Sequence, residues 1–161
     1  MWWFWLLLVV SGLFALGALF GAPYVPTLKK SGNDLLDMID LKSGATIIDL
    51  GSGDGAFALQ AAKRGYKVIG YEINPILVII ARLRTLKYRK NVTIYLRDYW
   101  RIELPKADAI YVFLIERYMQ KLGDKLKNEV KKPTLVVSHV FKIPNLKPIK
   151  ENQNTSVYKV G

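Results

Sequence analysis

Hydrophobic and polar positions divide the chain into two parts of different character. Residues 1–28 contain no charged side chain, and Trp2 to Ala22 form a run that would be apolar on every side of a helix. From Lys29 onward, short apolar runs of strand length alternate with stretches in which apolar residues recur at helical spacing. The pattern therefore predicts a separate N-terminal segment followed by one α/β domain.

The alternation in the second part predicts six strands and four helices. The expected strands are residues 46–50, 67–72, 92–96, 109–113, 135–140 and 156–160. The expected helices are a short one from Ser31 or Asn33 to about residue 43, and residues 56–63, 75–87 and 118–131. A short loop with Pro105 leaves little room for a helix between the third and fourth strands, and the polar stretch 144–155 is assigned no element. Because the strands are apolar on both faces, we expect a Rossmann-like, doubly wound, mostly parallel sheet.

Composition narrows the chemistry that this domain can perform. The 161 residues include no cysteine and one histidine, so disulfides, thiolate metal sites and a cysteine nucleophile are excluded, and we predict no metal site. His139 lies in the apolar run LVVSHV and is interpreted as structural. The 24 Lys and Arg exceed the 13 Asp and Glu, for a net charge of +11, which is typical of proteins that bind nucleic acid or an anionic membrane surface. A cluster interpreted as a solvated helix end comprises Arg82, Arg84, Lys87, Arg89 and Lys90.

The uncharged N-terminal run predicts a membrane anchor. Trp2 to Ala22 is 21 residues long, and a helix of that length matches the hydrocarbon layer of a bilayer, roughly 30 Å thick. The aromatic cluster at residues 2–5 suits a membrane interface. A cleaved signal peptide and a buried core helix are the alternatives. Lys29 and Lys30 follow the run, so the positive-inside rule places the rest of the chain on the cytoplasmic side of a single-pass protein.

These boundaries predict three regions. Residues 1–22 form the anchor, residues 23–31 form a linker that contains PYVPT, and residues 32–161 form the α/β domain. Two prolines three positions apart exclude regular helix from the linker.

A glycine-rich turn follows the first predicted strand and carries the candidate chemistry. Its sequence, DLGSGDG, runs from Asp49 to Gly55 and precedes an Ala-rich helix, as expected of a loop that lets a cofactor approach the backbone. The loose G-x-G-x-x-G/A dinucleotide pattern also fits, with Glu72 where that fold keeps a ribose-binding acid, whereas a P-loop is excluded because no Gly-Lys-Ser/Thr follows.

Carboxylates in this turn favour a cationic cofactor over a pyrophosphate. Asp49 and Asp54 would repel a pyrophosphate, whereas S-adenosylmethionine carries a sulfonium and an amino group and no phosphate. Glu72 could then accept both ribose hydroxyls, and Asp98 could accept from the adenine amino group. Surface or turn roles remain the alternatives for these acids.

The motifs resemble those of class I S-adenosylmethionine-dependent methyltransferases. DLGSGDG, GYEINP and RDYW lie in the right order, each after its expected strand. With the apolar run, PYVPT and VFLIERYMQKLGDKL, the chain is similar to the membrane-anchored protein-lysine methyltransferases that act on the ATP synthase c subunit and the adenine nucleotide translocase. The resemblance covers the chain to about Pro144, and DYW stands where the family commonly has Asp-Leu-Trp.

The resemblance implies an enzyme that methylates a lysine of a membrane-embedded protein, with S-adenosylmethionine as the cofactor. The cofactor-binding residues would be Asp49, Gly51, Ser52, Gly53, Gly55, Glu72 and Asp98. By their positions in the linker and after the fourth strand, Tyr24, Thr27, Tyr111 and Glu116 are candidates for the acceptor channel, and Tyr24, Thr27 and Glu116 are the predicted catalytic residues. A nucleic-acid or small-molecule methyltransferase and a non-catalytic, membrane-tethered cofactor-binding module are the alternatives. Against nucleic acid, the fourth strand is followed by Phe-Leu-Ile-Glu rather than Asn/Asp-Pro-Pro-Tyr/Phe.

Overall fold

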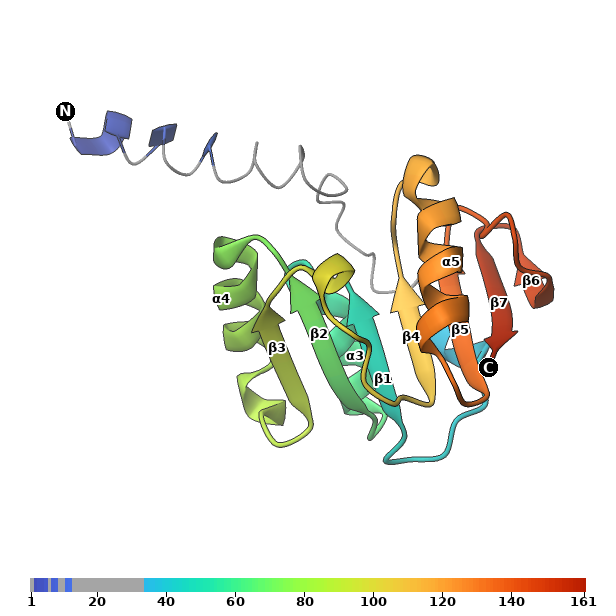
Figure 1. Cartoon of the computed structure of the whole chain (residues 1–161). Coiled ribbons are helices and arrows are strands. Elements are labelled where there is room, and N and C mark those ends of the chain that lie inside the picture. Colours follow the sequence, from blue (N-terminus) through green and yellow to red (C-terminus); the bar gives the residue numbers. More distant parts are fainter. Residues whose placement is uncertain (1, 6, 9–10, 13–33) are drawn as a thin grey trace.

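A seven-stranded sheet forms the centre of the protein (Figure 1). The computed structural model describes residues 2–5, 7–8, 11–12 and 34–161. The strands are β1 (Thr46–Leu50), β2 (Lys67–Glu72), β3 (Val92–Leu96), β4 (Ala109–Val112), β5 (Thr134–His139), β6 (Pro148–Asn152) and β7 (Thr155–Val160). They lie in the order β3-β2-β1-β4-β5-β7-β6, with the first five parallel and β7 antiparallel to both of its neighbours. The predicted doubly wound, mostly parallel sheet is thus confirmed.

Helices cover both faces of the sheet. Helices α3 (Ala56–Lys63) and α4 (Pro75–Arg84) lie on one face, and α5 (Met119–Glu129) lies on the other (Figure 1). Three short 3-10 turns complete the domain, η1 (Leu86–Tyr88), η2 (Tyr99–Arg101) and η3 (Glu116–Tyr118). The start of α4 shows why the chain turns into a helix there, because the Asn74 side chain accepts hydrogen bonds from the backbone N–H of Ile76 and Leu77 and Pro75 occupies the first turn.

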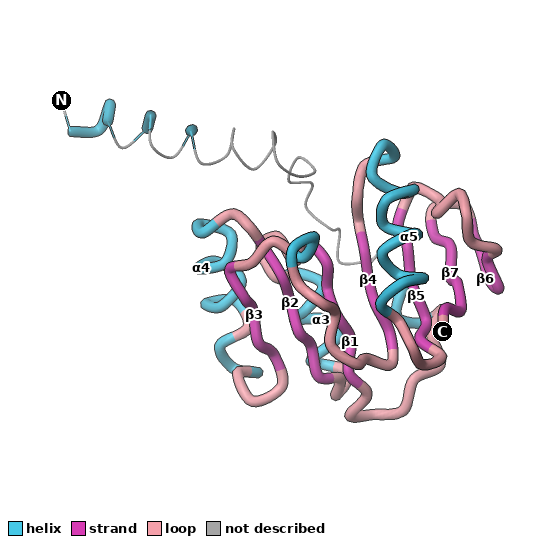
Figure 2. The backbone as a smooth tube through the Cα atoms, in the orientation of Figure 1, coloured by secondary structure: helices cyan, strands magenta, loops and turns pink. Residues whose placement is uncertain are grey.

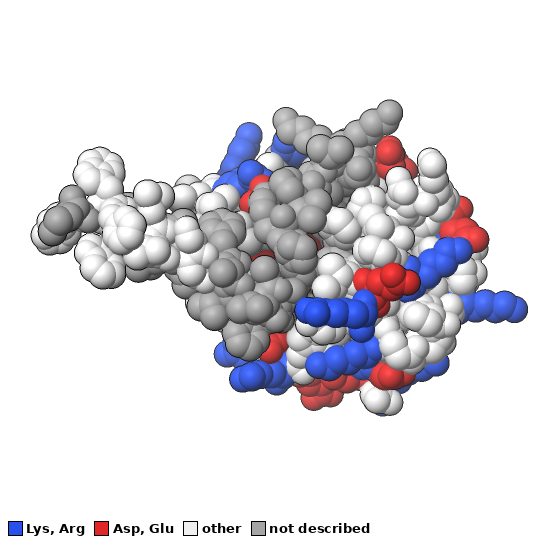
Figure 3. Space-filling view, turned by 90° about the horizontal axis from the view of Figure 1, so that it is seen from above, with Lys and Arg blue, Asp and Glu red and all other residues white. Residues whose placement is uncertain are grey.

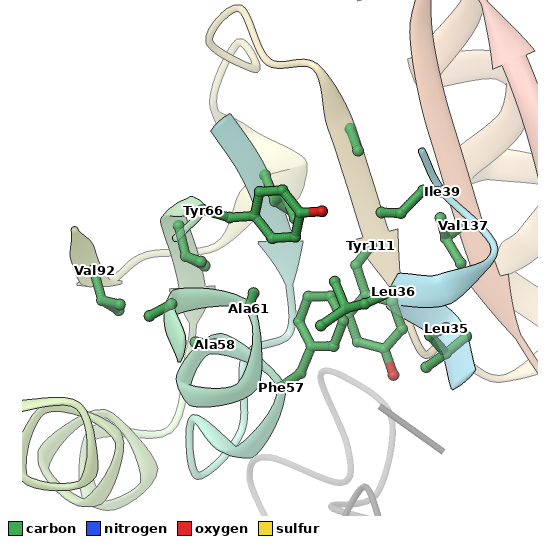
Figure 4. Close-up of a cluster of buried hydrophobic side chains, with 14 of the residues drawn as sticks. Leu35, Leu36, Ile39, Phe57, Ala58, Ala61, Tyr66, Val92, Tyr111 and Val137 are labelled. Atoms are coloured by element: carbon green, nitrogen blue, oxygen red, sulfur yellow. The ribbon is translucent and has the colours of Figure 1, made fainter. Parts of the chain in front are cut away.

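The strands alternate side chains between two hydrophobic cores. Ile47 of β1 packs in the core beneath α3 and α4, whereas Ile48 and its equivalents on other strands pack beneath α5. In the first core, Phe57 of α3 stacks on Tyr111 of β4 with ring centroids 3.8 Å apart (Figure 4). Burial on both faces explains why the interior strands β1 and β4 are almost continuously apolar.

The structure differs from the predicted elements at a few places. The helix expected over residues 75–87 ends at Arg84, because Thr85 donates its hydroxyl to the Ala81 carbonyl and the chain continues as η1. The first expected helix, predicted to end at about residue 43, is described from residue 34; residues 34–37 form one helical turn and residues 38–43 are not helical, so the predicted end is wrong. The sequence pattern does not predict β6, since its residues are polar and mostly exposed at the sheet edge and show no hydrophobic alternation. Between β3 and β4 only η2 is helical, as the short loop predicts (Figure 2).

The N-terminal predictions fall largely outside the described residues. The described residues of that region, 2–5, 7–8 and 11–12, are helical. Among the parts of the chain that the structure describes, no helix is both long and apolar enough to cross a bilayer. The linker of residues 23–31 lies outside the described residues altogether.

Candidate cofactor and active site

The glycine-rich turn connects the carboxyl end of β1 to α3, at the edge of the sheet where parallel strands end. Gly51, Gly53 and Gly55 all have positive φ angles, of 82°, 53° and 77°, which side-chain-bearing residues rarely adopt. The backbone N–H groups of Gly51 and Ser52 both donate to the Tyr71 carbonyl at 2.9 Å. The turn is therefore held against the end of β2, with an open space where a Cβ of Gly51 would point.

Glu72, at the end of β2, fixes the shape of this turn. One carboxylate oxygen accepts a hydrogen bond from Gly53 N–H at 2.9 Å, and the other accepts from Ile73 and Asn74 N–H at 2.8 Å each. Sequence reasoning proposed Glu72 only as a ribose acceptor and missed this structural role. A carboxylate offers about four acceptor positions, so three backbone bonds leave capacity for a ligand hydroxyl.

Asp49 is the chemically most unusual residue of the site. It lies in the central strand β1 and is only 1% exposed, and neither carboxylate oxygen has a hydrogen-bond partner within the described residues. Burial, with smaller effects from the Glu72 and Asp54 charges, raises the pKa of Asp49 from 3.8 to about 8. A buried carboxylate without a partner is costly to a fold and marks a position where a cationic or hydrogen-bond-donating ligand would fit.

Ser52 extends this set of unpartnered polar atoms. Its hydroxyl is buried and has no partner in the described part of the chain. Ser52 lies close to Gly70 of β2, where an added Cβ would come within 3.0 Å of the Ser52 side chain. Since Asp49 pairs with Gly70 across the sheet, the two unpartnered groups belong to the same small region.

Two further acids at this edge are already engaged. Asp54 accepts from Ala56 N–H at 3.1 Å at the start of α3 and forms an ion pair with Arg84 of α4. The ion pair offsets the negative charge that the sequence placed in the turn. Asp98 caps η2 by accepting from Trp100 N–H at 2.9 Å and lies 3.3 Å from the Arg101 guanidinium.

Aromatic side chains next to Asp98 were missed by sequence reasoning. Trp100 lies 4.8 Å from Tyr99 and 6.2 Å from Tyr118, measured between ring centroids, and the Lys121 ammonium lies 4.3 Å from the Trp100 ring. The sequence signal for this cluster was the position of Tyr99 and Trp100 soon after the third strand and of Tyr118 soon after the fourth. Their rings are tilted by 41° and 55° to one another and form a partly apolar cluster beside the proposed adenine acceptor.

The predicted acceptor residues are only partly covered by the structure. Glu116 begins η3 after β4, and its side chain is exposed. Tyr111 is buried in the core against Phe57. Tyr24 and Thr27 lie outside the described residues.

His139 ends β5 beside the residue that follows β4. Its ring centroid lies 5.1 Å from that of Phe113, and burial lowers the pKa of the imidazole. Its Nδ1 is buried and has no hydrogen-bond partner within the described residues, so the imidazole is not the fully hydrogen-bonded histidine expected of a structural role. No group of three or more acidic or His side chains suited to a metal ion occurs among the residues that the structure describes.

Several known proteins are similar to this chain in sequence. The lysine N-methyltransferase of the ATP synthase c subunit from Xenopus laevis is 31% identical over 128 residues, which cover 78% of this chain and 56% of that protein. The chain spans about half the length of this relative and of its human counterpart. A protein-lysine N-methyltransferase of Saccharolobus islandicus is 31% identical over 147 residues and is covered to 91%.

A solved structure shows the same fold over nearly its whole length. An RNA methyltransferase from Salinibacter ruber, crystallised with S-adenosyl-L-homocysteine, superposes with a TM-score of 0.76 at 28% identity, covering 84% of this chain and 92% of that one. A family model described as the ANTKMT methyltransferase domain matches residues 49–150, from Asp49 into β6. The resemblance predicted from the motifs is confirmed, and the chain belongs to the ANTKMT methyltransferase domain family, within the class I S-adenosylmethionine-dependent methyltransferases.

Proposed function

We propose that the protein is an S-adenosylmethionine-dependent methyltransferase that modifies a lysine side chain of a membrane-associated protein. The observation that carries the cofactor part is the buried, unpartnered Asp49 carboxylate beneath a glycine turn. The lysine part is supported by relatives from animals and an archaeon that are named lysine methyltransferases. The membrane part is supported by the animal relatives, which are named for the c subunit of ATP synthase.

The residues present fit the cofactor's chemistry. Asp49 would attract its cationic amino group, Ser52 would offer a hydroxyl, and Glu72 would accept one ribose hydroxyl on its remaining acceptor position. Asp98 would accept from the adenine amino group next to the Trp100 ring. When bound, the cofactor supplies an electrophilic methyl group, so the protein has mainly to orient the acceptor and exclude water.

A lysine acceptor must lose a proton before it can attack. Its ordinary pKa is about 10.4, and desolvation beside a cation lowers that value, which favours the neutral amine. Glu116 begins η3 after β4, and its side chain is exposed to solvent. With Tyr24 and Thr27 of the linker, it is proposed to line the approach of the lysine.

An anchor of residues 1–22 would hold the domain on the cytoplasmic side of a membrane. This proposal rests on the uncharged run and on Lys29 and Lys30 after it. Such a tether would restrict the enzyme to acceptors close to the bilayer.

Methyl transfer from labelled cofactor tests the proposal. The full chain is incubated separately with membranes and with RNA, and labelled protein is digested and analysed for methyllysine. We expect methyllysine in a membrane protein, and loss of the label in Asp49→Asn. The matched control is Asp40→Asn, an exposed acid distant from the turn in the sequence, which should retain activity. Label in RNA alone, or cofactor binding without any transfer, would overturn the lysine proposal.

RNA methylation is the second candidate. The Salinibacter ruber structure and the net charge of +11 favour it. The sequence after β4, from Phe113 to Glu116, lacks the Asn/Asp-Pro-Pro-Tyr/Phe loop of amino-methylating nucleic-acid enzymes. For this reason lysine is the preferred acceptor.

A further inference from the structure

The outer face of α4 exposes aliphatic side chains that the methyltransferase reaction does not use. Four aliphatic side chains here are exposed by 38 to 67%, namely Ile79, Ile80, Leu83 and Leu86, the last in η1. The opposite side of α4, with Leu77, Val78 and Ala81, is buried. The helix thus has a second apolar stripe, on the side away from the core, where a soluble helix normally carries polar residues.

Basic residues surround this stripe, and the chain segment that carries them contains no acidic residue of its own, although Asp54 pairs with Arg84. From Ile73 to Arg97 the chain contains six Lys or Arg and no Asp or Glu. Arg82 and Arg84 flank the stripe at helical spacing and are held in place, Arg82 by the Ile94 carbonyl at 2.8 Å and Arg84 by Asp54. The remaining cations of the segment are exposed, namely Lys87, Arg89, Lys90 and Arg97.

The helix dipole explains in part why Lys and Arg lie at the end of α4. It does not explain why Ile and Leu side chains are exposed there. Nucleic acid would attract the cations and leave the aliphatic side chains without a role, since base stacking uses aromatic rings. A second copy of the chain would bring the same positive charges together. An anionic bilayer surface matches both features. Lipid phosphates attract the Lys and Arg side chains, and the boundary between headgroups and acyl chains accepts the aliphatic stripe.

We propose that the α4–η1 face, defined by Ile79, Ile80, Leu83 and Leu86 with the surrounding Lys and Arg, docks on an anionic membrane surface. α4 packs on β3, the edge strand of the sheet, so this face lies at one side of the molecule (Figure 1). Seen from above, Lys and Arg side chains lie at several places around the rim of the domain, so charge alone does not select one face (Figure 3). The exposed aliphatic stripe distinguishes the α4–η1 face from the other basic parts of the surface. The proposal depends on neither the methyl acceptor nor the N-terminal anchor.

A site-specific fluorophore tests which face meets the lipid. Because the chain has no cysteine, Leu83→Cys in the full chain can be labelled at one position with an environment-sensitive dye. The matched control is Ile149→Cys on β6, at the opposite edge of the sheet, where the native side chain is 54% exposed. Each protein is mixed with vesicles of equal parts phosphatidylcholine and phosphatidylglycerol, or of phosphatidylcholine alone. We expect a blue shift at position 83 with anionic vesicles, reduced at high salt, and none at position 149.

The basic residues are tested in the labelled Leu83→Cys background. Replacing Arg89 and Lys90 by Gln should lower the ratio of docked to undocked label about 30-fold, from about a factor of five for each cation near an anionic surface. An unchanged thermal transition shows that the variant is folded. The proposal is overturned if the dye at position 83 shows no blue shift with anionic vesicles, or if the shifts at positions 83 and 149 are equal. It is also overturned if the dye at position 83 shifts without vesicles, or when RNA replaces the vesicles. Because the readout is not methylation, its failure is distinguishable from a failure of the proposed function.

Discussion

Replacing Asp49 by Asn should stabilise the protein while removing cofactor binding. In the unfolded chain this carboxyl ionises at its ordinary pKa of 3.8, but in the native state its pKa is raised to about 8. At pH 7 folding must therefore place a proton on Asp49. That costs about 4 kcal/mol, from about 1.4 kcal/mol for each pH unit between 3.8 and 7. Asn has nearly the same shape and carries no charge, so the variant should be more stable by up to this amount.

The size of this stabilisation depends on pH in a defined way, whereas its sign does not change. Below pH 3.8 Asp49 is protonated in both states, and the two proteins should differ little. Between pH 3.8 and 8 the wild type should lose stability relative to the variant as the pH rises, and above about pH 8 the difference should become constant. Urea unfolding followed by circular dichroism from pH 4 to 9, with calorimetric titration of S-adenosylmethionine, measures both effects.

The outcome that refutes this reasoning is equally specific. If Asp49→Asn is no more stable than wild type at pH 7 and the stability difference does not vary with pH, Asp49 has a partner that keeps it ionised. If the variant still binds the cofactor with unchanged affinity, Asp49 does not contact the amino group. Asp40→Asn serves as the control, because that exposed acid should change neither quantity.

Contacts in the fold and the site lead to three further predictions. Cofactor affinity should rise with pH by up to tenfold per unit between pH 3.8 and about pH 8, because a bound cation favours ionised Asp49. The rise should end near pH 8, since the cofactor's α-amino group loses its own proton at about that pH. Proton release, measured by calorimetry in buffers of different ionisation enthalpy, checks this. Gly55→Ala should lower the free energy of unfolding by about 1 to 3 kcal/mol, since the φ of Gly55 is 77° and the new Cβ would lie 2.9 Å from the Ala81 Cβ. Adding Ala81→Gly should restore part of this loss in a double-mutant unfolding experiment. Tyr158→Phe should lower the free energy of unfolding in urea by about 1 to 3 kcal/mol, because the Tyr158 hydroxyl accepts from the buried Ile143 N–H at 2.9 Å. An unchanged urea midpoint would show that this N–H finds another acceptor.

Chain order alone predicts where the proposed cofactor residues lie. Asp49, Glu72 and Asp98 each stand at or just after the carboxyl end of an apolar strand, and parallel strands bring those ends to one edge of the sheet. The boundaries of β1, β2, β3 and α3 match the prediction because apolar runs of strand length and an Ala-rich helix give unambiguous patterns.

Pairings between distant segments could not be predicted in the same way. Asp54 and Arg84 are 30 positions apart and meet only because α3 packs beside α4. The hydrogen bond from Gly53 to Glu72 likewise depends on the positive φ angles of the turn. β6 could not be predicted from the sequence, because a polar edge strand is defined by pairing with its partner β7 rather than by a hydrophobic pattern of its own.

Helix α4 contacts the cofactor turn and its support at three separate points. The backbone N–H of its cap, Asn74, donates to Glu72, Ala81 packs against Gly55, and Arg84 pairs with Asp54. A ligand that tightens the turn must therefore also stabilise the helix, and by thermodynamic linkage whatever holds the helix must strengthen ligand binding by the same factor. The amide hydrogens of α4 should then exchange more slowly with deuterium when the cofactor is bound, although no residue after Asn74 in that helix is proposed to contact it.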